Sequence, residues 1–535
     1  MELQTRANKT PAPFSFAPSQ IFEGNDGKWS TFALRVGTPE QIFHVLISTA
    51  GQETWVPVPE GCLSTDPSDC GAQRGVLPFR NQPSSGFQIN ALEQSSTWTP
   101  INLYELGLDK ELNYTGNGQY GFDTVGLQLP QSGGVSLEHQ LVAGIATKDF
   151  YLGMFGLGPK PTNFTTFNNP QGSFLWSLRN QSLIPSLSWG YTAGANYQLT
   201  RTPGSLTLGG YDASRFTPNN LTFQFSADDS KPLTLGLQAI QATNTFQGVM
   251  SLLPSGILTV IDSTVPEIWL PLAACRIFEA AFGLQYDPST DRYLVNDTTH
   301  AALLSMNPVL TFKIGSTVDG GNNTNINLPY KAFDLQASYP IYPNTTNYFP
   351  LRRAMNDSQY TLGRTFLQEA YVIADYERSN FSVSQCVFNE KMTNDIITIK
   401  SPTEVVGKVG LQKNAIIGIV VAVVVFLAIS LIGLVFWFRR RKIRRPKKGE
   451  SNDQVSLDKH NTAEDERDTL VHTGPIEASA DHRRFEMMGR EKDLPTHELL
   501  TVDQATEMIG RDRDLAHELY TVDKVVELPA GRNGA

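Results

Sequence analysis

Two segments of the chain place residues capable of acid–base chemistry at matching positions. LISTAGQETWVPVP occupies Leu46–Pro59 and VIDSTVPEIWLPLA occupies Val260–Ala273, and at an offset of 214 positions Ser48 corresponds to Asp262. A carboxylate can take a proton from a water molecule, whereas a serine hydroxyl titrates far too high to share that proton. The pattern predicts a duplicated site in which one half keeps a carboxyl group and the other half lacks it.

The two segments also match around the carboxyl position. The further pairs are Ile47 with Ile261, Glu53 with Glu267, Trp55 with Trp269 and Pro57 with Pro271. Two similar lobes that face each other would bring both segments together, in the kind of interdomain cleft where ligands commonly bind. We therefore expect an internal duplication with one site between its halves.

The elements that must position these segments are mainly strands. Short runs of β-branched and aromatic residues are bounded by Gly, Pro, Asn and Asp, a pattern typical of strands and turns. The clearest runs are 30–37, 43–49, 205–212, 256–262 and 369–376, and helical periodicity is confined to short stretches such as 172–181 and 272–283. The sequence therefore predicts a mainly β fold.

Several further motifs accompany the duplicated segments. MFGLGP at 154–159, GSLTLGGYDASRF at 204–216 and TLGRTFLQEAYVIADYERSNFSVS at 361–384 resemble, with both segments, elements of the pepsin-like aspartic protease family, peptidase A1. The resemblance covers most of residues 14–398. It implies a bilobal fold with an N-terminal lobe at 14–212 and a C-terminal lobe at 213–398.

The family's chemistry uses two carboxyl groups that share a proton. The ionised one activates water, and the protonated one donates to the peptide carbonyl. By resemblance, Asp262 is the surviving family aspartate and Ser48 stands where the other is missing, while the motif glycines are replaced by Ala50 and Thr264. Losing one acid–base partner lowers a rate by roughly 10²- to 10⁴-fold. We therefore expect impaired catalysis.

The resemblance also assigns supporting residues. Thr49 and Ser263 keep hydroxyl groups that are expected to bond across the lobe interface, beside Trp55 and Trp269. A flap hairpin over the cleft is expected at 112–127 with Tyr114 as its tyrosine, and Tyr120 is the alternative. Either tyrosine is equally well explained as an ordinary hairpin aromatic.

Ser48 is a poor candidate for a nucleophile of its own. The nearest histidine in sequence, His44, lies four positions back on an extended strand. At about 3.3 Å per residue that base is out of hydrogen-bonding reach.

A long apolar run follows the predicted lobes. After a linker at 399–414, residues 415–438 carry no charge over 24 positions, enough as a helix of ~1.5 Å rise per residue to cross a bilayer of ~30 Å. Eight of the ten residues in 439–448 are basic. The positive-inside rule then places the tail in the cytosol and the preceding residues outside. The arrangement is similar to that of membrane-anchored fungal relatives of the family, which implies the cell surface.

The rest of the C-terminal segment, 439–535, is expected to be a disordered cytosolic tail, because it is too polar to form a core. It repeats HELLTVD at 497–503 as HELYTVD at 517–523. These repeats are either docking peptides for a cytosolic adaptor or low-complexity drift.

Sequons and cysteines both lie before the apolar run, as expected for exported residues. The four cysteines allow three pairings; the short loop favours Cys62 with Cys70 and leaves Cys275 with Cys386, and free thiols are the alternative. The predicted glycosylation sites are Asn8, Asn113, Asn163, Asn180, Asn220, Asn296, Asn322, Asn344, Asn356 and Asn380.

Charge and spacing exclude other functions. The net charge of -10 argues against a nucleic acid partner, and neither metal-ligand spacing nor a phosphate-binding glycine loop is present, so we expect no cofactor. The sequence predicts a single-pass membrane glycoprotein whose impaired, protease-like ectodomain binds extended peptides or cell-surface ligands. The alternative is an active aspartic endopeptidase that uses Asp262 and a compensating group.

Overall fold

The computed structural model describes residues 11–78, 89–165, 168–402 and 413–442. Of the predictions above, Asn8 and both tail repeats lie outside the described residues. The described part is mainly β, and its residues up to Val424 belong to one compact unit.

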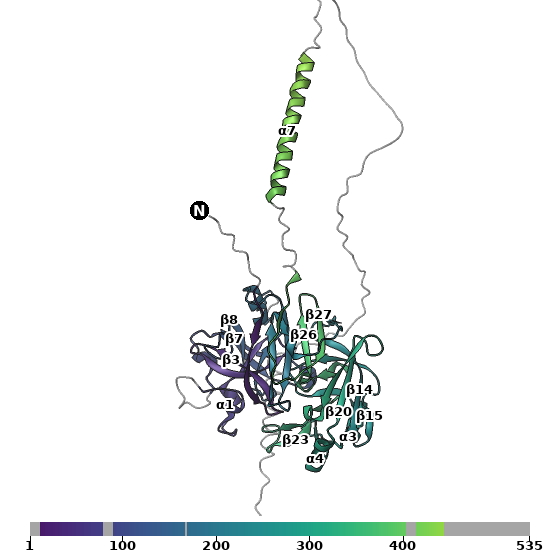
Figure 1. Cartoon of the computed structure of the whole chain (residues 1–535). Helices are drawn as coiled ribbons and strands as arrows, with labels where there is room; N and C mark the ends of the chain where they lie inside the picture. The colour runs from purple at the N-terminus through teal and green to yellow at the C-terminus, as the bar shows by residue number, and fades with distance from the viewer. Residues whose placement is uncertain (1–10, 79–88, 166–167, 403–412, 443–535) are drawn as a thin grey trace, which may run out of the picture. The chain divides into compact units, whose positions relative to one another are not determined.

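The N-terminal lobe is built on an eight-stranded sheet, at the left of Figure 1. An additional pairing of its second strand with its seventh, Val36 with Val125, rolls the sheet up around Phe32, Val45 and Phe155. In spatial order the strands are β2 (Pro18–Glu23), β3 (Trp29–Val36), β4 (Gln41–Ser48), β9 (Gly153–Gly156), β5 (Thr54–Pro57), β8 (Ser136–Ile145), β7 (Asn117–Leu127) and β6 (Thr99–Glu105).

The C-terminal lobe, at the right of Figure 1, is built on a second eight-stranded sheet. Its path is β21 (Asn323–Pro329), β20 (Val309–Gly315), β14 (Thr234–Thr245), β16 (Ile257–Ile261), β25 (Thr361–Leu362), β17 (Ile268–Pro271) and β24 (Leu351–Ala354), and β15 (Gly248–Ser251) pairs with β14. A four-stranded sheet completes the lobe with β18 (Gln285–Asp287), β19 (Arg292–Leu294), β23 (Thr346–Phe349) and β22 (Leu335–Ala337).

A six-stranded sheet joins the two halves. Strands from both halves pair within it, for example Tyr191 with Val372, so the lobes share backbone hydrogen bonds. Its order is β1 (Phe14–Phe16), β11 (Thr202–Leu208), β10 (Ser188–Ala195), β26 (Ala370–Asp375), β27 (Asn380–Gln385) and β13 (Phe223–Gln224). Beside it β12 (Gly210–Asp212) pairs with β28 (Ile396–Thr398). The predicted mainly β, bilobal fold is confirmed.

The helices of the described lobes are short, and residues at their ends help to define where they begin and stop. Ser173 begins α2 by accepting from the Trp176 amide, and Gly283 ends α3 in the left-handed conformation at φ 64°, which glycine adopts without strain. The α-helices are α1 (Cys70–Gln73), α2 (Phe174–Asn180), α3 (Leu272–Phe282), α4 (Asp297–Met306), α5 (Arg364–Leu367) and α7 (Lys413–Lys442). Short 3₁₀ turns are η1 (Pro59–Gly61), η3 (Leu92–Gln94), η4 (Lys110–Leu112), η5 (Ala213–Arg215), η6 (Tyr330–Ala332) and η7 (Asp357–Gln359).

The cysteines follow only half of the predicted pairing. Cys62 and Cys70 form a disulfide across a short loop. The predicted Cys275–Cys386 bridge is wrong, because both residues are buried free thiols. Cys275 packs from α3 against the carbonyl of Leu270, whereas Cys386 follows β27 and lies 3.3 Å from the Thr192 hydroxyl.

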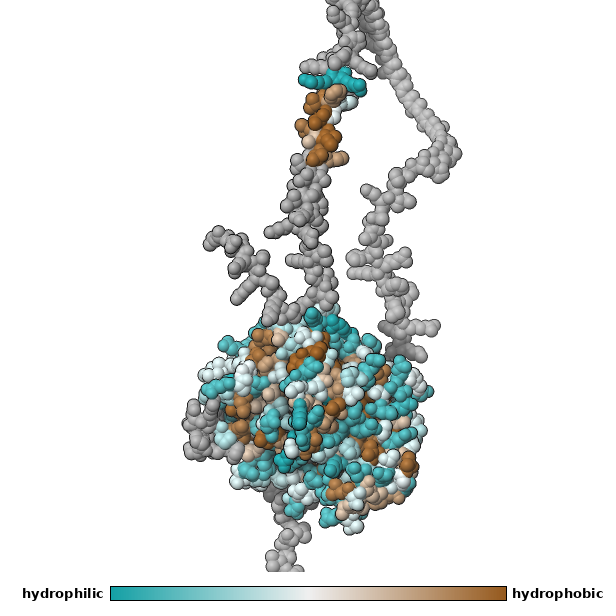
Figure 2. All heavy atoms as spheres, in the orientation of Figure 1, coloured by the Kyte–Doolittle hydropathy of each residue, from teal (hydrophilic) through white to brown (hydrophobic). Residues whose placement is uncertain are grey.

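The predicted apolar run falls within α7, whose side chains are described from Val425 to Arg440. Figure 2 shows them as a mainly apolar surface that ends in a polar patch. Among the residues that the structure describes, no helix is long and apolar enough to cross a membrane.

Candidate functional site

Matching strand arrangements in the two lobes position the duplicated segments. Ser48 ends β4, which runs parallel to β9 with Ser48 opposite Gly156. Asp262 directly follows β16, which runs parallel to β25, and the Asp262 amide donates to the Leu362 carbonyl at 3.1 Å. In each lobe the strand after the turn pairs antiparallel with that same partner: β5 pairs with β9, and β17 pairs with β25. We call β9 and β25 the crossing strands. The two turns are therefore structural equivalents.

The crossing strands need glycine where they pass closest to the turns. A Cβ at Gly156 would lie 2.6 Å from the Gln52 amide nitrogen, and one at Gly363 would lie 2.2 Å from the Glu267 carbonyl oxygen. Neither contact is sterically tolerable. Any other residue at either position would push its turn out of place.

Reciprocal hydrogen bonds tie the two turns together. The Thr49 amide donates to Ser263 Oγ at 3.0 Å, and the Ser263 amide donates to Thr49 Oγ1 at 2.9 Å. Ser263 Oγ also donates to the Ile47 carbonyl at 2.6 Å. Because all these groups are buried, each bond replaces one that water would otherwise make, and the lobes are fixed relative to each other at this point.

The hydroxyl of Ser48 meets a second hydroxyl group, that of Thr264, in the other turn. Ser48 Oγ lies 2.8 Å from Thr264 Oγ1 and accepts from the Gly51 amide at 2.7 Å. Ser48 and Thr264 are 1% and 2% exposed. Neither hydroxyl ionises near neutral pH, so this contact supplies no acid–base partner for Asp262.

A carboxyl group from another element accompanies Asp262. Asp109, in the loop between β6 and β7, hydrogen-bonds to Asp262 side chain to side chain, and it is only 7% exposed. Burial, followed by the charge of Asp262, raises the pKa of Asp109 well above its usual range. Asp262 itself accepts from the Thr264 amide at 2.8 Å. A carboxyl pair therefore exists, but it is not the pair that the duplicated segments would make.

Arg364, at the start of α5, supports the second turn from beneath. Its Nη1 donates to the carbonyls of Ser263 and Thr264 at 3.0 and 2.6 Å, and its Nη2 pairs with Asp26 of the N-terminal lobe at 3.0 Å. The side chain is 2% exposed. No such donor is visible from the sequence pattern of the two turns alone.

Comparison with known proteins assigns this arrangement. Residues 31–386 match the family described as "Eukaryotic aspartyl protease", which is more than half of the chain. The chain belongs to the eukaryotic aspartyl protease family. This confirms the family and the fold predicted from the duplicated segments.

Relatives of this aspartyl protease family occur in Candida albicans. Candidapepsin-4 of strain WO-1 is 22% identical over 67% of this chain and 76% of its own length. Secreted aspartic protease 5 of strain SC5314 is 23% identical over 71% of this chain and 81% of its own length. Secreted aspartic protease 8 of the same strain is 24% identical over 68% of this chain and 76% of its own length.

Glu53 and Glu267, which occupy matching positions in the two duplicated segments of this aspartyl protease fold, have different charge environments. Burial raises the pKa of Glu53, which accepts from Trp55, Tyr120 and Thr162. Burial would also raise the pKa of Glu267, but two arginines outweigh it and hold that pKa below its usual range. The two arginines are Arg352 and Arg292, each 3.4 Å from Glu267 Oε1.

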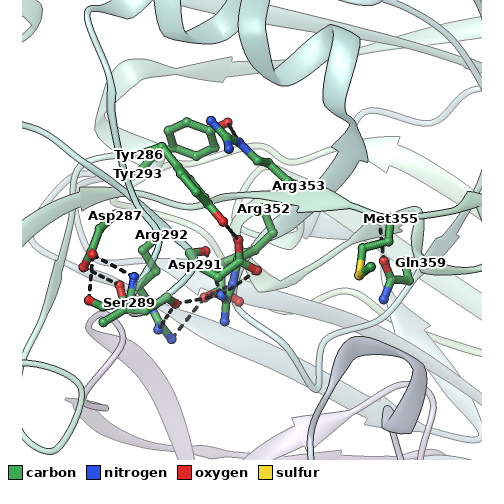
Figure 3. A network of polar contacts seen from close by, with 12 residues as sticks. Tyr286, Asp287, Ser289, Asp291, Arg292, Tyr293, Arg352, Arg353, Met355 and Gln359 are labelled. Atoms are coloured by element: carbon green, nitrogen blue, oxygen red, sulfur yellow. Dashed lines mark hydrogen bonds and ion pairs between the residues drawn. The ribbon is translucent and has the colours of Figure 1, made fainter.

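A larger polar network surrounds these arginines at the edge of the C-terminal lobe (Figure 3). Arg352 Nη1 pairs with Asp291 at 3.1 Å, and the neighbouring Arg353 donates to the Tyr293 hydroxyl at 2.8 Å. Arg352 also lies over the Trp269 ring, 5.1 Å from its centroid. The second tryptophan of the duplication therefore packs in a cationic environment, unlike Trp55.

The two candidates for the flap tyrosine make different contacts. Tyr120 is on β7 and donates to Glu53 at 2.7 Å. Tyr114 is in the loop before β7, packs with Val265 and Trp269 of the other lobe, and has its hydroxyl 3.5 Å from Glu267. The loop that carries Tyr114 therefore reaches across the cleft.

That loop separates two pockets. One, of 340 Å³, is lined by Ser48–Glu53, Trp55 and Leu106–Leu108. The other, of 440 Å³, is lined by Leu112–Tyr114, Trp269 and Arg352 among others. Asp262, 3% exposed, lines neither of these two pockets.

The described sequon asparagines lie at the surface of the fold. Eight of them are exposed, and Asn380, at the start of β27, is half-buried. The exposed ones are Asn113, Asn163, Asn180, Asn220, Asn296, Asn322, Asn344 and Asn356.

Sequence reasoning did not find Asp109 or Arg364. Asp109 sits in LGLDKEL, a segment with neither a motif nor a counterpart in the other lobe. Arg364 follows the crossing glycine directly, and that position, beside a residue in close contact with the second turn, is the signal that would have pointed to it.

Proposed function

We propose that this chain is a membrane-anchored, pepsin-like protein that binds extended peptides or cell-surface ligands in its cleft and is catalytically impaired. One observation carries the proposal: at the duplicated turns, Ser48 bonds to Thr264 through two hydroxyl groups. Hydrolysis by the family's route requires one ionised and one protonated carboxyl group at those turns. The chain supplies only Asp262 there.

A peptidase assay tests the proposal. The full-length protein, purified in detergent, is incubated with fluorogenic peptides between pH 3 and pH 6, with and without pepstatin and beside an Asp262→Asn variant. We expect no turnover that depends on Asp262. Pepstatin-sensitive cleavage that Asp262→Asn abolishes would contradict the proposal.

A second candidate function, an active aspartic endopeptidase, is favoured by the position of Asp109. Its carboxyl group bonds to Asp262 and is the one described group that supplies a second acid there. In that case Asp109→Asn would abolish cleavage as completely as Asp262→Asn. The same assay with this variant separates the two candidates.

Membrane attachment is part of the proposal. It is supported by the 24 uncharged residues at 415–438 and the basic segment that follows them. It is also supported by the exposed apolar side chains of α7, among them Phe426, Leu431 and Phe436. With the tail in the cytosol, the lobes would lie at the cell surface, where the exposed sequons would carry glycans and the tail would meet a cytosolic adaptor.

A further inference from the structure

The loop between β6 and β7, Leu106–Gly116, is held against both lobes. On the N-terminal side Leu108 approaches the first turn, since its Cδ2 lies 3.3 Å from the position of a Cβ on Gly51. On the C-terminal side Leu112, 3% exposed, packs with Val265, Trp269 and Ala354. The loop is thus packed on both sides of the cleft at the level of the two turns.

Polar contacts fasten the same loop to the C-terminal lobe. Lys231 pairs with Glu111 at 2.9 Å, and Gln359 donates to the Glu111 carbonyl. Within the loop, the amides of Leu112 and Tyr114 donate to the Asp109 carbonyl at 2.9 and 3.2 Å. These two amides therefore stay protected only while the turn around Asp109 is intact.

Asp109 is the innermost polar group of the loop. It holds a left-handed backbone conformation at φ 56°, and its Oδ2 is buried with no hydrogen-bond donor among the described residues. Two carboxylates cannot be buried side by side with both ionised, because their charges repel and neither is hydrated. One proton between them turns the contact into a hydrogen bond.

The loop Leu106–Gly116 is the tip of the hairpin in which the flap is expected, and we call it the lid. We propose that one proton held between the carboxyl groups of Asp109 and Asp262 fastens this lid in its closed position over Asp262. A peptide that reached Asp262 would have to displace the lid and release that proton. The biological meaning of the lid rests on the proposed peptide-binding function, whereas the lid itself is measurable without any peptide.

The charged groups that face Asp109 set the direction of the pH dependence. They are Asp262 after β16, Glu111 in η4 and Lys231 before β14; the first two raise its pKa, and Lys231 opposes them. In an open lid Asp109 would be hydrated, with an ordinary pKa near about 4. The closed state is therefore fully favoured below about pH 4 and weakens as the pH rises toward the elevated value.

Hydrogen–deuterium exchange of the full-length protein tests this proposal. Protection of the Leu112 and Tyr114 amides is measured from pH 4 to pH 8 and corrected at each pH for the intrinsic exchange rate. Loss of one proton on opening predicts that protection falls by up to about tenfold per pH unit within the titration window. Protection of β26 and β27 in the same samples reports that the fold is intact.

Two variants remove the need for the proton. Asp109→Asn and Asp262→Asn each leave an amide that donates to the remaining carboxylate without titrating, so we expect protection of the lid to become independent of pH. The matched control is Glu105→Gln, since Glu105 belongs to the same hairpin but is exposed and pairs with Lys110. It should keep the wild-type pH dependence.

The outcomes are decisive in both directions. Lid protection in the wild type that does not change with pH would overturn the proposal, as would a Glu105→Gln variant that loses the pH dependence equally. If one asparagine variant does not fold, the other still decides. Peptidase activity in the earlier assay would overturn the proposed function and leave this measurement unaffected.

Discussion

At the scale of single residues, the site is defined by which side chain occupies the catalytic position in each turn. Ser48 is not loosely placed, because it bonds to both Thr264 and the Gly51 amide. The Thr264 side chain stands where the family motif has glycine. The difference from the family motif is therefore a repacked turn, and it is more than the loss of one carboxyl group.

Ser48→Asp alone is expected to restore little activity. A carboxylate at this position would press against Thr264, and Ala50 would still occupy the other glycine position of the family motif. Although an acid–base partner is worth roughly 10²- to 10⁴-fold, we expect cleavage of a fluorogenic peptide at pH 4 to stay within about tenfold of the wild type. Adding Ala50→Gly and Thr264→Gly should raise it further.

Ser48→Asn is the matched control, since it has the same shape without the acid. A rate increase near 10²-fold in Ser48→Asp alone, absent in Ser48→Asn, would show that the rest of the turn was intact.

A second prediction at this scale concerns Glu369, which precedes β26. It is 3% exposed, and burial raises its pKa to about 7 although Tyr197, Gln198 and Gln385 donate to it. A raised pKa stabilises the fold fully below the unfolded value of about 4.3 and loses that effect as the pH rises through about 7. The loss amounts to roughly 4 kcal/mol.

Glu369→Gln removes this titration, so its thermal midpoint should fall less than that of the wild type between pH 4.5 and pH 8. Glu138→Gln, at an exposed position on β8, should behave as the wild type. An unchanged pH slope in Glu369→Gln would assign the effect to other carboxyl groups.

At the scale of elements, the second turn depends on α5. Arg364 supplies donors to two carbonyls of the turn and an ion pair to Asp26 in the other lobe. Its guanidinium also lies 5.0 Å from the centroid of the Trp29 ring. One buried cation thus links the crossing glycine, the turn that carries Asp262 and the N-terminal lobe.

Arg364→Met should destabilise the fold by about 3–5 kcal/mol, because it leaves a carboxylate and two carbonyls without their donor. The measurement is the thermal midpoint of the purified protein. The control is Arg378→Met, which breaks an ion pair with Asp375 at a site where the arginine side chain is 38% exposed. That change should cost less than about 1 kcal/mol. Equal losses in both variants would refute the role given to Arg364.

At the scale of the whole molecule, the features that could be predicted from the sequence are those that occur twice along the chain. The duplicated segments yielded both turns, the Thr49 and Ser263 positions and the bilobal fold, because a repeat constrains both copies at once. Asp109 escaped prediction because it reaches Asp262 only through the path of one unrepeated loop. The Cys275–Cys386 pairing was wrong because an even number of cysteines carries no information on which elements face each other.

The remaining prediction concerns how the chain is anchored. If 415–438 spans a bilayer, the full-length chain expressed in cells should stay in the membrane pellet through alkaline carbonate extraction, whereas a form ending at Thr398 should be released. Val425→Arg with Ala428→Arg places two charges near the middle of the run, at a cost of roughly 5–7 kcal/mol for insertion, and should release the protein. Val425→Leu with Ala428→Leu, which changes the same positions without charge, should remain bound. Release of the full-length chain, or retention of the form ending at Thr398, would show that the lobes are held by something other than the apolar run.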